Sequence, residues 1–342
     1  MRKGFISVII LIFVAVLSGC GSKKEAGTSA GSDVKNTDAK TESASKAPSV
    51  IKFGVQPSTQ PPFIAEELGL FDEIEKKYNT SIEFVKFASG GPENNALAAG
   101  EISWAEYGMA PAIVGMDKAD GLLTSVDVLN ETALIAAPDI ASAADLKGKT
   151  VGFPGKGSQQ YPLMLLALEQ AGMKEADINL ISMDAGNMTE ALKNGQLSAF
   201  IAWDPFITTA VKNGTGKTLL SSDQIMPLKD GHYLGEGTVV KRGFAEDYPE
   251  LTQDMVDALA KANAYIVDHP DEVPAMWNKA VGLDPAVIEY SLQNKMAVYV
   301  KNIQPDPASL KAYIDMLNKY EITQISDVDL FLKDHLWSGE YR

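Results

Sequence analysis

Short apolar segments alternate with segments of helical periodicity along most of the chain. Strand-like runs are expected at residues 50–55, 81–87, 102–107, 122–128 and 150–153. After residue 241 the apolar positions fall three or four residues apart, which predicts helices with one buried face. Strands that alternate with helices indicate βαβ units, and therefore an α/β fold with mainly parallel sheets.

One part of this pattern occurs twice. Residues 96–111 read ALAAGEISWAEYGMAP, and residues 191–206 read ALKNGQLSAFIAWDPF. In both copies a helix end, a turn with glycine and a strand lead to a loop that contains proline. The segments upstream, 51–71 and 151–173, are each a short strand, a loop with serine and glutamine, and a helix. A unit that recurs once predicts two similar α/β lobes.

The chain is expected to cross between these lobes near residues 131 and 231. The first lobe would then comprise residues 49–130 and 231–342, and the second lobe residues 131–230. The two crossing strands would form a hinge. Because ligands of open α/β sheets bind beyond the carboxyl ends of the strands, two facing lobes would place four strand-end loops around one cleft.

The N-terminus has the features of an export signal. Residues 1–3 are charged, and the apolar run of residues 5–17 is short for a membrane span and typical of a signal peptide. Leu17-Ser18-Gly19-Cys20 resembles the lipobox of bacterial lipoproteins, which predicts cleavage after residue 19 and lipidation of Cys20. The alternative is an uncleaved anchor. Residues 21–48 are polar and small, which predicts a flexible tether.

Composition narrows the function further. The chain has 342 residues, with 30 basic and 45 acidic side chains and a net charge of −15. This balance disfavours nucleic acid as a partner. Cys20 is the single cysteine, which excludes a disulfide within the chain and a thiolate metal cluster. The three histidines are far apart in the sequence, so no metal site, cofactor site or nucleophile–base pair is predicted.

A series of short motifs carries a family resemblance. In order along the chain these are Ala96-Leu97-x2-Gly100-x-Ile102, Asp145-Leu146-Lys147-Gly148-Lys149-x-Val151, Lys156-Gly157-Ser158, Trp203-Asp204-Pro205 and Phe244-Ala245-x3-Pro249-Glu250. Their order and spacing resemble the substrate-binding proteins of ABC importers for sulfonates, taurine and nitrate, a group that also includes binders of pyrimidine precursors. The resemblance covers roughly residues 49–329 and implies a two-lobe periplasmic-binding-protein clamshell of type II.

The resemblance also implies a function. The chain would be a monomeric, lipid-anchored extracytoplasmic protein, and not an enzyme. It would capture a small sulfonate-like or zwitterionic solute, of the aliphatic sulfonate or taurine type, and deliver it to an ABC permease. The alternatives are a binder of a thiamine-pyrimidine-like heterocycle or a small aromatic acid, and a ligand-loaded sensor that docks a membrane receptor.

In the second lobe, candidate ligand-binding residues lie in two strand-end loops. Gly157, Ser158 and Gln159 precede a helix, whose free amides suit a sulfonate or carboxylate oxygen, and Ser158 could equally cap that helix. Trp203 could form a wall of the cleft or belong to the core. Asp204 could accept a ligand N–H, cap the next helix, or do both.

In the first lobe, the matching candidates come from two loops and from the returning strand. They are Gln56, Ser58, Thr59, Gln60, Tyr107, Gly108, Met109, Glu236 and Thr238. Tyr107 could donate its hydroxyl or be a core residue, and Glu106 is expected to be solvated. No arginine occurs in these loops, so a bidentate clamp for a dicarboxylate is disfavoured. Acceptors beside amide donors favour a zwitterion or a polar heterocycle over an inorganic anion.

Overall fold

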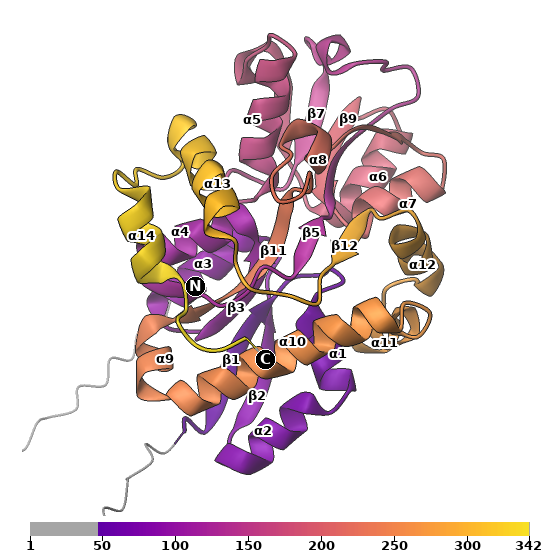
Figure 1. Cartoon of the computed structure of the whole chain (residues 1–342). Coiled ribbons are helices and arrows are strands. Elements are labelled where there is room, and N and C mark those ends of the chain that lie inside the picture. Colours follow the sequence, from indigo (N-terminus) through magenta and orange to yellow (C-terminus); the bar gives the residue numbers. More distant parts are fainter. Residues whose placement is uncertain (1–46, 342) are drawn as a thin grey trace, which may run out of the picture. The chain divides into compact units, whose positions relative to one another are not determined.

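The computed structural model describes residues 47–341, which form one compact unit (Figure 1). The predicted signal peptide, Cys20 and nearly all of the tether lie outside the described residues. Within them, no helix is long and apolar enough to cross a bilayer.

The first lobe is built on a seven-stranded sheet. Six of its strands follow the spatial order β12 (Ala297–Tyr299), β5 (Val128–Asn130), β11 (Leu234–Lys241), β3 (Trp104–Gly108), β1 (Val50–Val55) and β2 (Ser81–Lys86), and β4 (Gly121–Leu123) pairs with β11. Strand β1 is parallel to β2 and β3, whereas β11 is antiparallel to β3, β4 and β5.

The second lobe is built on a five-stranded sheet. Its spatial order is β10 (Lys217–Ser221), β6 (Thr132–Ala136), β9 (Ala199–Trp203), β7 (Thr150–Phe153) and β8 (Asn179–Ser182). Strand β7 is parallel to β8 and β9, and β6 is antiparallel to β9 and β10. Both sheets are therefore mixed rather than mainly parallel, because β11 and β6, the strands that enter each lobe, run against their neighbours.

The sequence repeat corresponds to a structural repeat. The order β2-β1-β3-β11 in the first lobe matches β8-β7-β9-β6 in the second, with the same parallel and antiparallel pairings. Residues 96–111 and 191–206 contain β3 and β9, which hold equivalent places in the two sheets. This equivalence confirms the prediction of two similar α/β lobes joined by two crossing segments.

Helices cover both sheets. Those of the first lobe are α1 (Pro61–Glu67), α2 (Leu70–Tyr78), α3 (Gly90–Ala99), α4 (Met109–Ala119), α9 (Arg242–Asp247), α10 (Pro249–Asp268) and α11 (Val273–Val281). Those of the second lobe are α5 (Gln160–Gln170), α6 (Ala185–Lys193), α7 (Phe206–Lys212) and α8 (Ser222–Ile225), with 3₁₀ turns at Ala143–Leu146 and Glu175–Asp177. The predicted face of α10 is buried, including Leu251, Met255 and Leu259.

Asp-Pro pairs mark two helix starts. Asp284 caps α12 (Pro285–Gln293) by accepting a hydrogen bond from the backbone N–H of Ala286, and Asp306 caps α13 (Pro307–Lys319) in the same way. Aspartate at the cap and proline in the first turn are each favourable at a helix start. The third pair, Asp204-Pro205, has a cis peptide bond, and Pro205 rather than Asp204 is the cap residue of α7.

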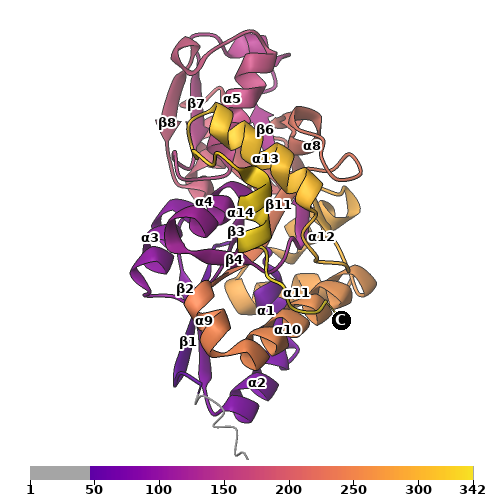
Figure 2. The same ribbon diagram turned by 60° about the vertical axis from the view of Figure 1, so that its left-hand side comes forward.

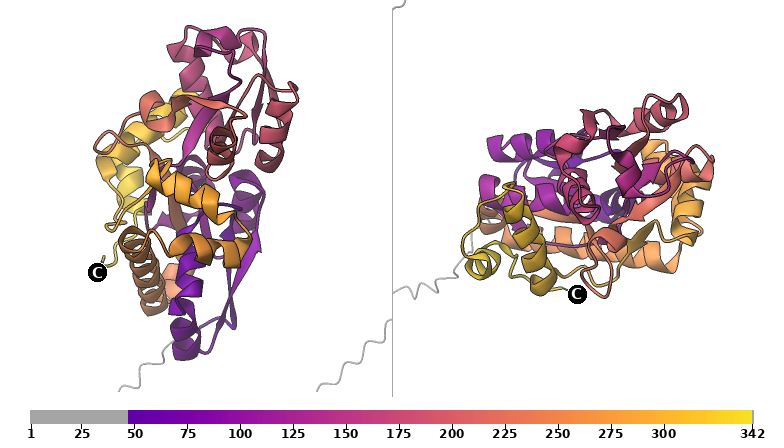
Figure 3. Two further views of the ribbon diagram at one scale, coloured as in Figure 1. Left: turned by 90° about the vertical axis from the view of Figure 1, so that its right-hand side faces the viewer. Right: turned by 90° about the horizontal axis from the view of Figure 1, so that it is seen from above.

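The C-terminal helices connect the lobes. In Figures 1 and 2, α13 and α14 (Val328–His335) are drawn in yellow, and Figure 3 shows them on one side of the two sheets. Lys319 and Tyr320, at the end of α13, both bind the carboxyl group of Glu169 in α5. A single buried apolar cluster runs from the first lobe through Tyr313 of α13 into the second lobe, with Met109 and Met164 among its members.

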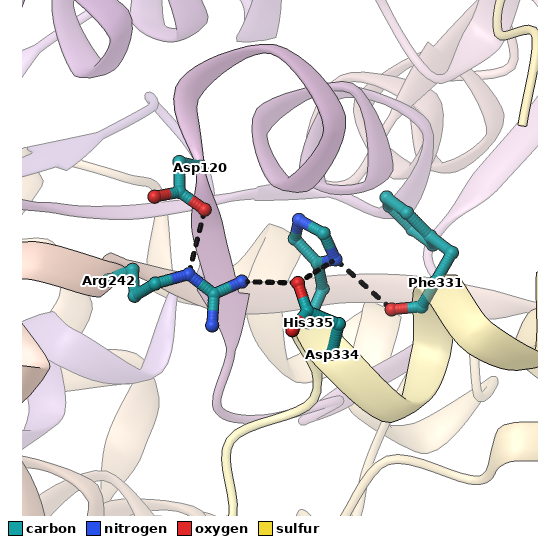
Figure 4. Close-up of polar contacts among 5 residues, drawn as sticks. All are labelled: Asp120, Arg242, Phe331, Asp334 and His335. Carbon is teal, nitrogen blue, oxygen red and sulfur yellow. Dashed lines mark hydrogen bonds and ion pairs between the residues drawn. The ribbon is translucent and has the colours of Figure 1, made fainter.

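Helix α14 is fastened to the first lobe by an arginine. Arg242 donates hydrogen bonds to Asp120 at 2.8 Å and to Asp334 of α14 at 2.9 Å (Figure 4). The ring of His335 stacks on Phe331, and its Nδ1 donates a hydrogen bond to the backbone oxygen of that residue at 3.1 Å. Because both carboxylates that bind Arg242 are largely exposed, these two ion pairs contribute modestly to the free energy of unfolding, on the order of 1 kcal/mol.

Candidate functional site

A cavity lies where strand ends of the two lobes meet. It is small, about 10 Å³, roughly the space for one water molecule, so a larger solute requires the lobes or the lining side chains to move. The first lobe contributes Gln56 after β1, Ser89 and Gly90 at the start of α3, and Gly108, Pro111 and Glu236 from β3, α4 and β11. The second lobe and its boundary contribute Glu131, Ser158, Gln159, Gln160 and Trp203.

The lobes touch closely around this cavity. A Cβ atom added to Gly157 would lie 2.9 Å from the Cα of Gly91, and one added to Gly108 would lie 2.8 Å from the Cβ of Gln159. Such distances are shorter than side chains tolerate. The closed arrangement of the lobes therefore depends on glycine at both contacts.

Two carboxyl groups face the cavity. Glu131 stands between β5 and β6, at the first crossing between the lobes, and Glu236 lies on β11 opposite Gly108, the last residue of β3. Oxygen Oε1 of Glu131 accepts hydrogen bonds from Gln159 Nε2 at 2.6 Å and from the hydroxyl of Thr132 at 2.7 Å. Its Oε2 is buried and has no hydrogen-bond partner among residues 47–341.

Four more carboxyl groups are buried around these two. Glu93 accepts a hydrogen bond from Gln56 Nε2 at 2.8 Å, and Asp127 accepts one from Ser125 at 2.8 Å. Glu106 and Asp204 each accept a hydrogen bond from a threonine, Thr238 and Thr208 respectively. Among residues 47–341, no lysine, arginine or histidine forms an ion pair with any of the six.

This burial disfavours the charged form of each carboxyl group. Loss of water raises the pKa of Glu236 to about 8, with a further contribution from the charge of Asp127. Burial, followed by the charge of Glu236, raises the pKa of Glu131 well above its ordinary value. Burial also raises the pKa of Asp204 to about 6. The site is therefore rich in carboxyl groups that lack a cationic partner.

Trp203 lies at the end of β9 with its ring edge-on to Phe206, at a centroid distance of 5.4 Å. It lines the cavity and also belongs to the apolar cluster of the second lobe. It is therefore both a wall of the cavity and a core residue. Its indole Nε1 is buried and has no hydrogen-bond partner within the described residues.

The structure brings six of the fourteen predicted ligand-binding residues to the cavity. These are Gln56, Gly108, Ser158, Gln159, Trp203 and Glu236. Glu131 and Gln160 were not among the predicted contacts, and neither were Ser89, Gly90 and Pro111. A glutamate at the point where the chain is expected to cross between the lobes, near residue 131, is the signal in the sequence that could have identified Glu131.

Several other candidates do not line the cavity but form hydrogen bonds to the residues and segments around it. Ser58 donates a hydrogen bond to Glu236, and Gln60 donates one to the backbone oxygen of Glu106 at 2.7 Å. The backbone oxygen of Thr59 accepts a hydrogen bond from Tyr299 at 2.7 Å. The loop after β1 thus uses its polar side chains mainly to hold its own shape and to position Glu236.

Three assignments of side-chain setting are corrected, those of Glu106, Ser158 and Asp204, and for Tyr107 the core alternative holds. Glu106 is fully buried rather than solvated. It lies two residues before the end of β3 and pairs across the sheet with Thr238, which covers it. Tyr107 is a core residue, on the opposite face of β3. Ser158 does not cap α5, since its hydroxyl donates to the backbone oxygen of Gly155 and Gln159 is the cap residue. Asp204 likewise caps no helix and binds Thr208 instead.

The remaining candidates lie next to the cavity without lining it. Met109 is buried at the start of α4, with its backbone N–H bonded to Gln159, and Gly157 forms the contact with Gly91. Thr238 lies two residues after Glu236 on the same strand. Within residues 47–341, no group of three or more histidine, cysteine, aspartate or glutamate side chains is arranged to hold a metal ion.

Comparison with known proteins finds a matching family and several similar proteins of known type. The model of the NMT1-like family matches residues 45–278. A protein of Bacillus subtilis (strain 168), provisionally named an aliphatic sulfonates-binding protein, is 26% identical over 304 residues, which cover 86% of this chain and 83% of that protein. The taurine-binding periplasmic protein of Escherichia coli (strain K12) is 25% identical over 224 residues, which cover 65% of this chain and 68% of that protein.

Solved structures share the fold. The alkanesulfonate-binding protein SsuA from Xanthomonas axonopodis pv. citri, bound to MOPS, superposes with a TM-score of 0.71 at 20% sequence identity. The match covers 85% of this chain and 99% of that protein. Together with the two sheets described above, this similarity confirms the predicted periplasmic-binding-protein fold of two α/β lobes.

Proposed function

Because the chain belongs to the NMT1-like family, we propose that it is the solute-binding component of an ABC importer. In this role it captures a small polar organic solute between its lobes and delivers it to a permease in the cytoplasmic membrane. The named relatives, which bind sulfonates and taurine, support this class of function. The bound solute is released chemically unchanged.

The observation that carries the choice of solute is the pair of carboxyl groups on the cavity wall, which need a cationic or N–H-bearing partner once they ionise. Glu131 and Glu236 line the cavity, and its described lining includes no lysine, arginine or histidine. An anion without a hydrogen-bond donor would meet two acidic groups and no side-chain cation. A solute that carries an ammonium group or another N–H donor would instead satisfy the buried, unpartnered Oε2 of Glu131.

We therefore favour a zwitterion of the taurine type over a simple alkanesulfonate. Its ammonium group would bind Glu131 and Glu236, which would recover the charge–charge attraction that these carboxyl groups lack in the ligand-free protein. Its sulfonate oxygens would accept hydrogen bonds from backbone N–H groups such as that of Met109, at the positive end of α4.

A second candidate is an amino-substituted heterocycle, such as a thiamine-pyrimidine-like ring. Trp203 favours it, because the ring lines the cavity with its Nε1 unpartnered, and a flat solute could stack on or abut it. The amino group would still bind a carboxyl group. A sensor role, in which the loaded protein docks a receptor instead of a permease, would use the same site.

The proposal extends to location. Leu17-Ser18-Gly19-Cys20 supports export and a lipid anchor on Cys20, with residues 21–48 as the tether between anchor and lobes. Mass spectrometry of the membrane-associated protein tests this point. A mature chain that begins at lipidated Cys20 would support it, and a chain that retains residues 1–19 would contradict it.

A thermal-shift panel on the form lacking residues 1–20 tests the function. The panel contains taurine, unsubstituted alkanesulfonates, an aminopyrimidine and small aromatic acids. A solute at a hundred times its dissociation constant should stabilise the protein by about 2.7 kcal/mol. Stabilisation by taurine or the aminopyrimidine supports the proposal. A panel in which no compound stabilises the protein, or only aromatic acids do, would contradict it.

A further inference from the structure

Gln159 connects the two lobes through its side-chain amide, which bonds Met109 of the first lobe at one end and Glu131 at the crossing between the lobes at the other. Its carboxamide oxygen accepts a hydrogen bond from the backbone N–H of Met109, the first residue of α4 in the first lobe. Its nitrogen donates to Oε1 of Glu131 at 2.6 Å, at the crossing into the second lobe. Gln159 itself precedes α5 of the second lobe and is 2% exposed. One buried amide thus binds both sides of the cavity.

The two groups that Gln159 occupies are those that a solute needs. The N–H of Met109 is a helix-start donor and has no acceptor within its own helix. Glu131 is the cavity carboxyl group whose second oxygen remains unpartnered. A carboxamide presents one acceptor and one donor side by side, so it satisfies both positions at once. A zwitterion presents the same two kinds of group.

The side chain also fills space at the contact between the lobes. A Cβ atom on Gly108 would come within 2.9 Å of Gln159 Oε1, and the hydroxyl of Tyr313 lies 3.4 Å from the same oxygen. Tyr313 belongs to α13, the helix that spans both lobes. The position of Gln159 is therefore defined by packing on several sides as well as by its hydrogen bonds.

We propose that Gln159 is an internal competitor of the solute. In the ligand-free protein its carboxamide occupies the Met109 N–H and the Glu131 carboxyl group, holds the lobes together, and leaves these positions when a solute enters. Its competition with the solute rests on the proposed function, whereas its connection of the lobes concerns the ligand-free protein alone. Gln159 thereby sets affinity by reducing the fraction of protein that is ready to bind.

Hydrogen exchange in the ligand-free protein tests the connection between the lobes. The Met109 amide of the wild type should be protected, and Gln159→Leu, which keeps the volume of the side chain but neither hydrogen bond, should speed its exchange roughly 3- to 10-fold. Gln170→Leu is the matched control, since Gln170 lies on α5 and donates to Ile225 within the second lobe. It should leave Met109 exchange unchanged.

Two results would overturn the proposal. One is a Met109 amide that exchanges at the rate of an unstructured peptide in the ligand-free wild type, a measurement that needs no variant. The other is an unchanged exchange rate in a folded Gln159→Leu variant. Either result would leave Gln159 without a role in holding the lobes.

Affinity for taurine tests the competition. Gln159→Leu should bind taurine roughly 2- to 10-fold more tightly than the wild type, because no hydrogen bond of residue 159 has to be broken when the solute enters. Weaker binding by the variant would overturn the proposal and identify Gln159 as a direct contact. If taurine binds neither protein, the proposed function fails for this solute, and the exchange measurement alone decides the role of Gln159.

Discussion

Oxygen Oε1 of Glu236 lies 3.3 Å from the hydroxyl oxygen of Ser58, which donates a hydrogen bond to it. This contact joins the strand that enters the first lobe to the loop after β1. It provides a weak donor for a carboxyl group that is almost completely buried. The charged form of Glu236 is therefore poorly stabilised until another donor or a cation arrives in the cavity.

The first prediction concerns stability and pH. The folded-state pKa of Glu236 is raised to about 8, so the folded protein binds this proton more tightly than the unfolded chain does. The stabilisation of the folded protein that this proton provides is complete at pH values below the pKa of Glu236 in the unfolded chain. It is lost as the pH rises through about 8. Ligand-free Glu236→Gln should therefore lose less stability than the wild type between pH 5 and pH 8.5.

Urea unfolding at the two pH values measures this difference. We expect the wild type to lose at least about 1 kcal/mol more of its free energy of unfolding than the variant does between the two pH values, since one pKa unit corresponds to roughly 1.4 kcal/mol. Parallel pH dependence in the two proteins would show that Glu236 titrates normally in the folded state.

The second prediction concerns binding of an ammonium group. Glu131→Gln should weaken taurine binding by roughly 1.5–3 kcal/mol, because a charged acceptor in a buried site is replaced by a neutral one. Glu106→Gln is the matched control, since Glu106 is equally buried but does not line the cavity. Isothermal titration measures both. Equal losses in the two variants would count against a direct role for Glu131.

The third prediction concerns Trp203. Because its ring both lines the cavity and packs in the second lobe, alanine would also create a core void, and phenylalanine is the better substitution. Trp203→Phe should weaken binding by about 1 kcal/mol and abolish most of the fluorescence change on adding solute. Trp104→Phe, a change in the first-lobe core, should preserve that signal. A signal that survives in Trp203→Phe would place the responding ring elsewhere.

The fourth prediction concerns closure of the lobes. Gly157→Ala would place a Cβ atom 2.9 Å from the backbone of Gly91, whereas Gly91→Ala would place one 3.4 Å from Gly157, an ordinary contact. Gly157→Ala should keep the lobes apart and weaken solute binding roughly tenfold, which corresponds to about 1.4 kcal/mol. Gly91→Ala should bind nearly as the wild type does. X-ray scattering compares closure, and matching profiles for Gly157→Ala and wild type would refute the requirement for glycine.

The fold was largely predictable because it repeats. The segments around β3 and β9 share a turn with glycine, an apolar strand and a proline-marked loop, and this local chemistry fixes equivalent positions in two sheets. The antiparallel direction of β11 and β6 was not predicted. The direction of a strand depends on the side from which the chain enters the sheet, and the local pattern of apolar residues does not encode that side.

The site was less predictable because position along a strand decides which polar side chains reach the cavity. Glu236 and Thr238 share a face of β11, but Glu236 lies opposite the last residue of β3, whereas Thr238 lies opposite Glu106 and is covered. Buried carboxyl groups also contradict the usual expectation of solvation. Their burial becomes evident only when both lobes and the glycine contacts between them are in place.

The central claim is that the cavity between the lobes selects a solute with an N–H donor through Glu131 and Glu236. Titration calorimetry with taurine and with ethanesulfonate, which lacks the amino group, tests it most directly. At pH 8 the wild type should bind taurine at least about tenfold more tightly, a difference of roughly 1.4 kcal/mol. Equal or tighter binding of ethanesulfonate would contradict the account.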